Sequence, residues 1–168
     1  KDTRSAAHFA REAGEALEFV EATLRVNERQ RTRMVEKVQE ALGGDVRGRT
    51  VGMLGLSFKP ETDDLRDAPA IDIARELISR GAVVRAFDPV AMPGAARVLP
   101  EVQLCKNAYE SCEGADAMVL VTEWNQFRML DLDRLRSVLR QPVVVDLRNV
   151  YEPGPMRAAG FHYVCVGR

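Results

Sequence analysis

The sequence contains few of the residues that build disulfide frameworks and metal sites. It has three cysteines in 168 residues, Cys105, Cys112 and Cys165, and no C-x-x-C pair. An odd number of widely spaced cysteines argues against a disulfide framework and against a cysteine-based metal site, and it is typical of a reducing compartment. We therefore expect a cytoplasmic protein without a bound metal ion.

An excess of charge and long apolar segments are also missing. The 24 basic and 25 acidic residues leave a formal net charge of -1, which gives no indication of a nucleic-acid or membrane surface. The longest apolar runs, Met118 to Val121 and Val143 to Val145, are far shorter than the roughly 20 residues that span a bilayer. The two histidines, His8 and His162, are isolated, and no Ser-His-Asp or H-E-x-x-H arrangement is present.

The length is sufficient for one ordinary globular domain with an appended element. The chain begins at Lys1-Asp2-Thr3 without an initiator methionine, a signal peptide or a tag, and it enters a helical pattern at once. We expect it to be part of a longer protein.

The first 42 residues have a helical pattern. Residues 3 to 42 contain no proline, and their apolar residues recur close to helical spacing. Gly14 is expected to divide the pattern into a short and a long helix, and Gly43-Gly44 to end it. A helix of about 28 residues would be about 40 Å long, which exceeds the width of a small domain. We predict a helical dimerisation segment over residues 1–46; the alternative is a helix that packs along its own domain.

From Arg49 onward, short β-rich runs alternate with helical segments. This alternation predicts an α/β domain over residues 47–168, with a Rossmann-like, mostly parallel sheet of about six strands flanked by helices. The predicted strands are Thr50 to Leu54, Val83 to Phe87, Ala117 to Val121, Val143 to Asp146 and Tyr163 to Val166. The predicted helices are Pro69 to Arg80, Ala91 to Val98, Asp131 to Leu139 and Glu152 to Ala159.

The loop after the first predicted strand is unusual for a nucleotide-binding fold. Gly52 and Gly55 give G-x-x-G, not the dinucleotide motif G-x-G-x-x-G. Within the following LSFKPETDDLRDAP, Lys59 and Arg66 could contact phosphate groups. The neighbouring acids could hold these cations in place or cap the helix beginning near Pro69. The alternative is a solvated loop whose charges neutralise one another.

Other candidate residues follow the later strands, where open α/β sheets bind ligands. Asp88-Pro89 is interpreted as a turn, with a ribose-binding acid as the alternative. Trp124 and Phe127 are interpreted as core residues, with the wall of a site as the alternative. Arg148 could bind the same anion as Lys59, or it could form an internal salt bridge with Asp146 or with the acids of the loop after the first strand. These patterns indicate an anion-binding, nucleotide-like domain but no reaction.

Six ordered motifs together resemble the UDP-glucose 6-dehydrogenase family. The most specific motif is the lysine loop, Gly55 to Arg66, which is similar to the family's G-L-x-F-K-x-x-T-D-D-x-R. The others are Lys1-Asp2-Thr3-Arg4 (the end of the family's active-site signature, G-G-S-C-F-P-K-D-T), Val26-Asn27-Glu28-Arg29-Gln30, Phe87-Asp88-Pro89, Thr122-Glu123-Trp124 and Asp146-Leu147-Arg148-Asn149.

The resemblance implies the C-terminal part of a three-part enzyme. In this family an N-terminal Rossmann domain binds NAD, a central helical region forms a homodimer, and the last domain binds the UDP part of the substrate. Two hydride transfers to two NAD oxidise the C6 alcohol of the sugar to a carboxylate through a cysteine thioester. That cysteine lies three residues before the position of Lys1, and none of the chain's three cysteines matches it.

The resemblance also implies roles for six residues. Asp2 is similar to an aspartate that helps to handle the catalytic water. The cofactor-binding residues are expected to be Lys1 and Arg66, and the substrate-binding residues Phe58, Lys59 and Arg148. One departure is Leu147, where the family often has glycine in D-G-R, so the approach of this loop to the sugar can differ.

Related enzymes oxidise GDP-mannose or UDP-N-acetyl sugars, and these remain alternatives. Phe58-Lys59-Pro60 together with Thr122-Glu123-Trp124 favours UDP-glucose. A further alternative is a non-catalytic nucleotide-binding module. An NAD-binding Rossmann domain is disfavoured by the missing G-x-G-x-x-G motif.

Overall fold

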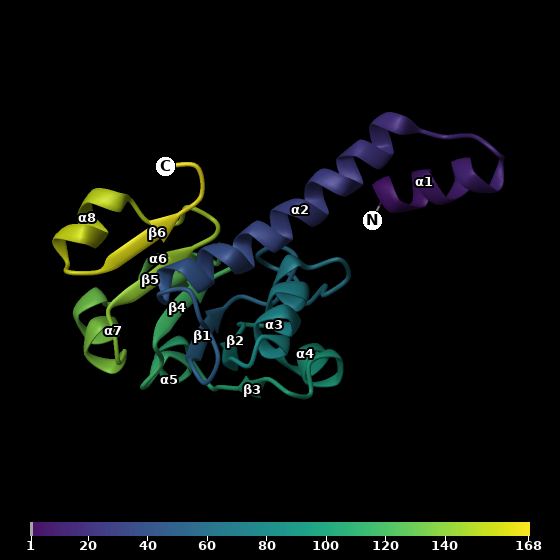
Figure 1. Cartoon of the computed structure of the whole chain (residues 1–168). Coiled ribbons are helices and arrows are strands. Elements are labelled where there is room, and N and C mark those ends of the chain that lie inside the picture. Colours follow the sequence, from purple (N-terminus) through teal and green to yellow (C-terminus); the bar gives the residue numbers. More distant parts are fainter. Residues whose placement is uncertain (1) are drawn as a thin grey trace.

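In the computed structural model, which describes residues 2–168, one parallel sheet of six strands has helices on both faces (Figure 1). The strand order is β3-β2-β1-β4-β5-β6, the doubly wound order of a Rossmann fold. The predicted fold class is therefore confirmed. The strands are β1 (Thr50–Leu54), β2 (Val83–Phe87), β3 (Gln103–Leu104), β4 (Ala117–Leu120), β5 (Val143–Asp146) and β6 (His162–Cys165).

The three central strands are nearly continuous apolar runs because both of their faces are covered. Every residue of β4 and β5 is buried, and in β1 only Thr50 is partly exposed. The outer strands β2 and β6 alternate between buried and more exposed residues. This contrast places the centre of the sheet at β1, β4 and β5.

Helices form the two outer layers. On one face, Val38 of α2 belongs to the same buried cluster as Val145 of β5. On the other face, Leu135 of α7 belongs to the same cluster as Val144 of β5. The helices are α1 (Asp2–Glu12), α2 (Glu18–Ala41), α3 (Pro69–Ser79), α4 (Met92–Val98), α5 (Ala108–Cys112), α6 (Asn125–Arg128), α7 (Leu132–Val138) and α8 (Pro153–Ala158).

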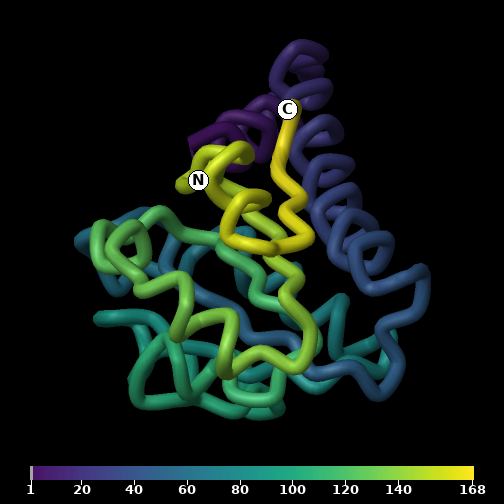
Figure 2. Tube along the Cα trace, turned by 90° about the vertical axis from the view of Figure 1, so that its left-hand side faces the viewer, coloured from purple at the N-terminus to yellow at the C-terminus, as the bar shows by residue number. Residues whose placement is uncertain are grey.

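The N-terminal helical pattern is divided near Gly14, as predicted. Helix α2 has 24 residues, which corresponds to about 36 Å. It ends before Gly43, whose φ of 87° lies in the left-handed region that glycine favours. The C-terminal part of α2 packs on the sheet beside β5 and β6, whereas its N-terminal part projects beyond the domain next to α1 (Figures 1 and 2). Phe19 on this projecting part is 86% exposed.

The structure adds small elements that the sequence pattern did not predict. β3 contains only two residues and pairs with β2 at the edge of the sheet. α5 is a single short turn whose N-cap, Asn107, accepts a hydrogen bond from the backbone of Glu110 at 2.9 Å. Such short elements offer too few residues for a period to be recognised.

The order of the strands reverses between β1 and β4, and Gly55 allows the chain segments that follow these two strands to lie close together. Gly55 has a φ of 88°, and a Cβ atom there would lie 2.7 Å from the backbone nitrogen of Thr122. The chains leaving β1 and β4 therefore approach more closely than any other residue would allow. Ligands of doubly wound folds bind outside the carboxyl ends of the strands at this point.

Within residues 2–168, no helix has the length and apolar content needed to cross a membrane.

Candidate functional site

A cleft of about 490 Å³ lies between α2 and the carboxyl ends of β1, β4 and β5. The loop after β1 contributes Phe58, and the loop after β5 contributes Arg148. Their position after strands on either side of the reversal is the one expected for a ligand site. The lining residues are Thr3, Arg4, Leu24, Asn27, Glu28, Gln30, Arg31, Met34, Phe58, Asp67, Pro69, Ile73, Val121, Leu147, Arg148 and Val166.

The loop after β1 forms a tight turn that contains Lys59. The backbone N–H of Phe58 donates to the carbonyl of Asp64 at 2.8 Å, which closes the turn. Glu61 within the turn has a φ of 60°. Lys59 is exposed and makes no hydrogen bond or ion pair with another residue in the range 2–168. It lies beside Phe58 but is not among the residues that line the cleft.

Arg66 is held by an acid of its own loop. Its Nε and Nη2 atoms donate to the two carboxylate oxygens of Asp64 at 2.8 and 2.7 Å. This hydrogen-bonded pairing raises the pKa of Arg66. The side chain of Arg66 is 69% exposed and lies in an open hollow beside Val90 and Arg97, outside the cleft.

The same loop is tied to both N-terminal helices through Asp67. Arg4 of α1 forms an ion pair with the Asp67 carboxylate at 2.9 Å, and Arg31 of α2 donates to its carbonyl at 3.2 Å. Arg31 also forms an ion pair with Asp72. Two roles were considered for the loop acids. Capping of α3 is wrong, because its N-cap is Ala68, without a capping side chain. The other role is confirmed for Asp64, which holds Arg66.

Asp2 lies in the first turn of α1 and is exposed; its neighbour Thr3, but not Asp2 itself, lines the cleft. Lys1, the other predicted residue of this motif, lies outside the described residues.

Asp88, which follows β2, is a buried structural carboxylate. Its Oδ2 accepts hydrogen bonds from the backbone N–H of Leu56 at 2.7 Å and of Ser57 at 3.0 Å, and from the Ser57 hydroxyl at 3.0 Å. Its Oδ1 accepts from the backbone of Val90 and Ala91 at 3.0 and 2.8 Å. Burial opposes ionisation, but these backbone donors outweigh it and lower the pKa of Asp88. The interpretation as a turn residue is confirmed, and no oxygen of Asp88 is left for a ribose.

Trp124 and Phe127 belong to the core, as interpreted. Phe127 is fully buried and packs edge-on against Phe87, with 6.2 Å between the ring centroids. The Trp124 indole N–H lies 3.2 Å from the Ser57 hydroxyl oxygen and 3.3 Å from the Asp88 carboxylate. Trp124 therefore helps to fix the residues immediately before Phe58.

Arg148 forms an internal salt bridge, but its partner differs from those considered. Its Nε and Nη2 donate to the two oxygens of Glu123 at 2.7 and 2.8 Å. This pairing raises the pKa of Arg148 and lowers that of Glu123. Sequence reasoning missed Glu123; its position directly after a buried strand, next to the strand that precedes Arg148, is the signal that could have revealed it.

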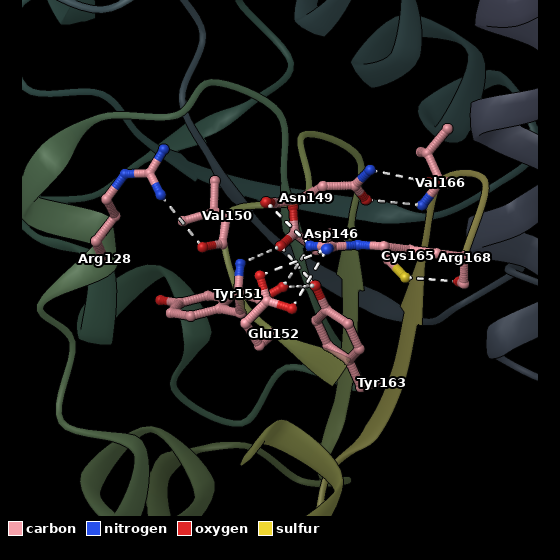
Figure 3. A network of polar contacts seen from close by, with 10 residues as sticks. All are labelled: Arg128, Asp146, Asn149, Val150, Tyr151, Glu152, Tyr163, Cys165, Val166 and Arg168. Atoms are coloured by element: carbon pink, nitrogen blue, oxygen red, sulfur yellow. Dashed lines mark hydrogen bonds and ion pairs between the residues drawn. The ribbon is translucent and has the colours of Figure 1, made fainter. Parts of the chain in front are cut away.

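Asp146 fixes the backbone of the loop that carries Arg148, and Figure 3 shows its contacts with Tyr151 and Tyr163. Its Oδ1 accepts from the backbone N–H of Arg148 at 3.0 Å. Its Oδ2 accepts from the Tyr151 backbone at 2.9 Å and from the Tyr163 hydroxyl at 2.8 Å. Burial, together with the nearby Asp146 carboxylate, raises the pKa of Tyr163. Asp146 is thus an anchor of the loop.

The described residues do not form a dinucleotide cradle. In such a cradle a glycine-rich turn leads directly from the first strand into a helix N-terminus, which binds the pyrophosphate. Here a charged loop separates the end of β1 at Leu54 from the start of α3 at Pro69. The acid after β2, Asp88, is occupied by protein donors. The cleft is therefore not a dinucleotide site of this kind.

The fold defines a Rossmann-like α/β domain, and similarity to known proteins gives its family. The model of the UDP-glucose/GDP-mannose dehydrogenase family, UDP binding domain, matches residues 52–153. The chain belongs to this family. It is 42% identical over its whole length to UDP-glucose 6-dehydrogenase from Rhizobium meliloti and 40% identical to UDP-glucose 6-dehydrogenase TuaD from Bacillus subtilis.

The solved structure of a UDP-glucose dehydrogenase from Pyrobaculum islandicum is similar throughout. It is 36% identical, covers 97% of this chain and superposes with a TM-score of 0.81. The chain spans 38% and 36% of the two curated relatives and 35% of the solved chain.

Proposed function

We propose that this chain is the UDP-sugar-binding part of an NAD-dependent UDP-glucose 6-dehydrogenase. The observation that carries the proposal is the cleft at the strand ends, which Phe58 and Arg148 line within a domain of the UDP-binding family. Whole-length identity to UDP-glucose 6-dehydrogenases supports UDP-glucose as the substrate. GDP-mannose and UDP-N-acetyl sugars remain the alternative substrates.

The proposed reaction converts UDP-glucose to UDP-glucuronate. The C6 alcohol is oxidised in two hydride transfers, and one water supplies the second carboxylate oxygen. The attacking cysteine would precede the position of Lys1, because Cys105, Cys112 and Cys165 are all buried and match no family nucleophile. We therefore expect this chain by itself not to turn over substrate.

Each predicted residue has a proposed task that fits its place. Phe58 offers an apolar surface inside the cleft, and Lys59 a point charge for a phosphate at its edge. Arg148 offers a guanidinium that can bind two oxygens. Asp2, at the exposed start of α1, is proposed to act on the catalytic water.

NAD would bind mainly to a preceding domain, since the described residues form no cradle for it. When bound, NAD would accept the hydride from the sugar. Arg66, which is exposed and held by Asp64, is proposed to contact this NAD. Lys1 is proposed to lie beside the same cofactor.

The projecting part of α2 is proposed to form the homodimer. Phe9, Phe19 and Val26 on α1 and α2 are exposed apolar residues. Pairing with a second chain would remove this surface from water. The three free thiols fit the reducing cytoplasm as the proposed location.

A test is to assay the full reading frame that contains this chain with UDP-glucose and NAD. We expect two NADH for each UDP-glucuronate formed, and a loss of at least tenfold in kcat/KM with Lys59→Ala. Lys106→Ala, at an exposed residue near the sheet edge, is the control. A higher kcat/KM for GDP-mannose or a UDP-N-acetyl sugar would contradict the assignment of the substrate.

A further inference from the structure

Arg148 and Glu123 follow two neighbouring strands of the sheet. Leu120 of β4 and Asp146 of β5 are register partners, so the residues just beyond them lie side by side. Glu123 follows β4 and Arg148 follows β5, and their side chains meet in a two-point contact. The sheet register therefore creates this pair.

The contact with Glu123 occupies one edge of the Arg148 guanidinium and leaves the other edge available to a ligand. Glu123 accepts from Nε and from one hydrogen of Nη2. A guanidinium has five N–H donors, so Nη1 and the second hydrogen of Nη2 remain. These form a second edge that can bind two oxygens of a phosphate. Arg148 lines the cleft, and Glu123 does not.

The backbone of Arg148 is fixed independently of its side chain. Buried Asp146 accepts a hydrogen bond from the backbone N–H of Arg148. The next residue, Asn149, has a φ of 55° and forms two hydrogen bonds with the backbone of Val166, at 3.0 and 2.9 Å (Figure 3). The long side chain of Arg148 can still change its rotamer, and the two hydrogen bonds to Glu123 restrict this motion. Arg128 is another cation close to Glu123, but it donates a hydrogen bond to the carbonyl of Val150 at 3.3 Å and so does not replace Arg148 as the partner of Glu123.

We propose that Glu123 is a positioning residue that presents the free edge of Arg148 to an anionic group of the ligand in the cleft. The inference rests on the proposed function, because it assigns Arg148 to the UDP-sugar. A side chain fixed before binding loses less freedom on binding. Losing Glu123 is therefore expected to weaken UDP binding about 3- to 10-fold.

The test is calorimetric titration of the chain with UDP for Glu123→Gln, Arg148→Lys and the double variant. Glu123→Gln should weaken binding, and it should add nothing in the Arg148→Lys background, because Glu123 acts through Arg148. Glu101→Gln, at an exposed residue before β3 at the opposite end of the strands, is the matched control. The thermal midpoint of Glu123→Gln should stay close to that of the control.

Additive losses in the double variant would overturn the inference, as would unchanged or tighter UDP binding by Glu123→Gln. Nitrogen-15 NMR of the ligand-free chain provides a separate readout. The Nε–H of Arg148 should exchange slowly with water, and fast exchange would show that the pair does not fix it. If the unaltered chain binds no UDP while this exchange is slow, the proposed function fails and the ligand role of Glu123 fails with it. The salt bridge would then be structural only.

Discussion

The carboxylate of Asp88, at the end of β2, accepts hydrogen bonds from both the backbone N–H and the hydroxyl of Ser57, just beyond the end of β1, each at 3.0 Å. In many nucleotide folds an acid at this position binds a ribose. Here the acid holds the protein's own loop, directly before Phe58 and Lys59. An acid at a position that binds ribose in other nucleotide folds thus supports, in this domain, the loop that is proposed to bind an anion.

Asp88→Asn should destabilise the chain by about 2–4 kcal/mol, because the new amide group would face N–H donors inside a buried site. The free energy of unfolding in urea measures this cost. Asp133→Asn, at an exposed residue of α7, should change it by less than about 0.5 kcal/mol. Equal effects of the two substitutions would contradict the role of Asp88.

The contribution of Asp88 should also depend on pH. Its folded pKa is lowered from the ordinary value of 3.8, so the charged form stabilises the fold at higher pH. This stabilisation is fully present above the ordinary value and is lost as the pH falls through the folded value. The difference in unfolding free energy between the unaltered chain and Asp88→Asn should therefore shrink below about pH 4. A constant difference down to pH 2 would show that ionisation of Asp88 does not matter.

Gly55→Ala should cost about 3 kcal/mol or more, because its Cβ would overlap Thr122 and its φ of 88° is strained for alanine. Gly114→Ala is the matched control, since Gly114 has a φ of 66° and no atom within 4 Å of an added Cβ. It should cost only about 1 kcal/mol. Thermal unfolding of both variants gives the two losses of stability. Their difference measures the cost of the overlap with Thr122, because backbone strain is present in both.

Helix α2 should divide into a core part and a surface part. Val38→Ala removes a fully buried side chain and should cost about 2 kcal/mol. Val26→Ala, at a 54% exposed residue of the same helix, should be close to neutral in the isolated monomer. Urea unfolding of both variants provides the comparison, and a large effect of Val26→Ala at low protein concentration would contradict this division.

The three cysteines should react slowly in the native chain. All three are buried, and burial raises the pKa of the Cys112 thiol to about 12, so almost no thiolate exists at pH 8. Mass spectrometry after iodoacetamide treatment should show little modification of Cys112 in buffer and full modification in urea. Rapid alkylation of native Cys112 would contradict its assignment as an inert core residue.

Most of the fold could be predicted because its central strands are buried on both faces. Apolar runs such as Val143–Asp146 can be recognised as strands from the sequence alone. Pro69 marks the start of a helix because proline suits the first helical turn, and Gly43 marks the end of one because glycine adopts a positive φ. The two-residue strand β3 could not be predicted, because it forms only through pairing with β2. In the site, sequence motifs identified the candidate residues but not their partners. Glu123 and Arg148 both follow buried strands, but their contact also depends on the pairing and register of β4 and β5, which a local pattern does not give.

We propose that the cleft and the lysine loop bind the UDP part of a nucleotide sugar rather than NAD. Calorimetric titration of the chain with UDP and, separately, with NAD tests it most directly, with Lys59→Ala and the control Lys106→Ala measured alongside. We expect heat with UDP that weakens in Lys59→Ala but not in Lys106→Ala, and no heat with NAD. Heat with NAD and none with UDP would contradict it, and the domain would then be a dinucleotide binder.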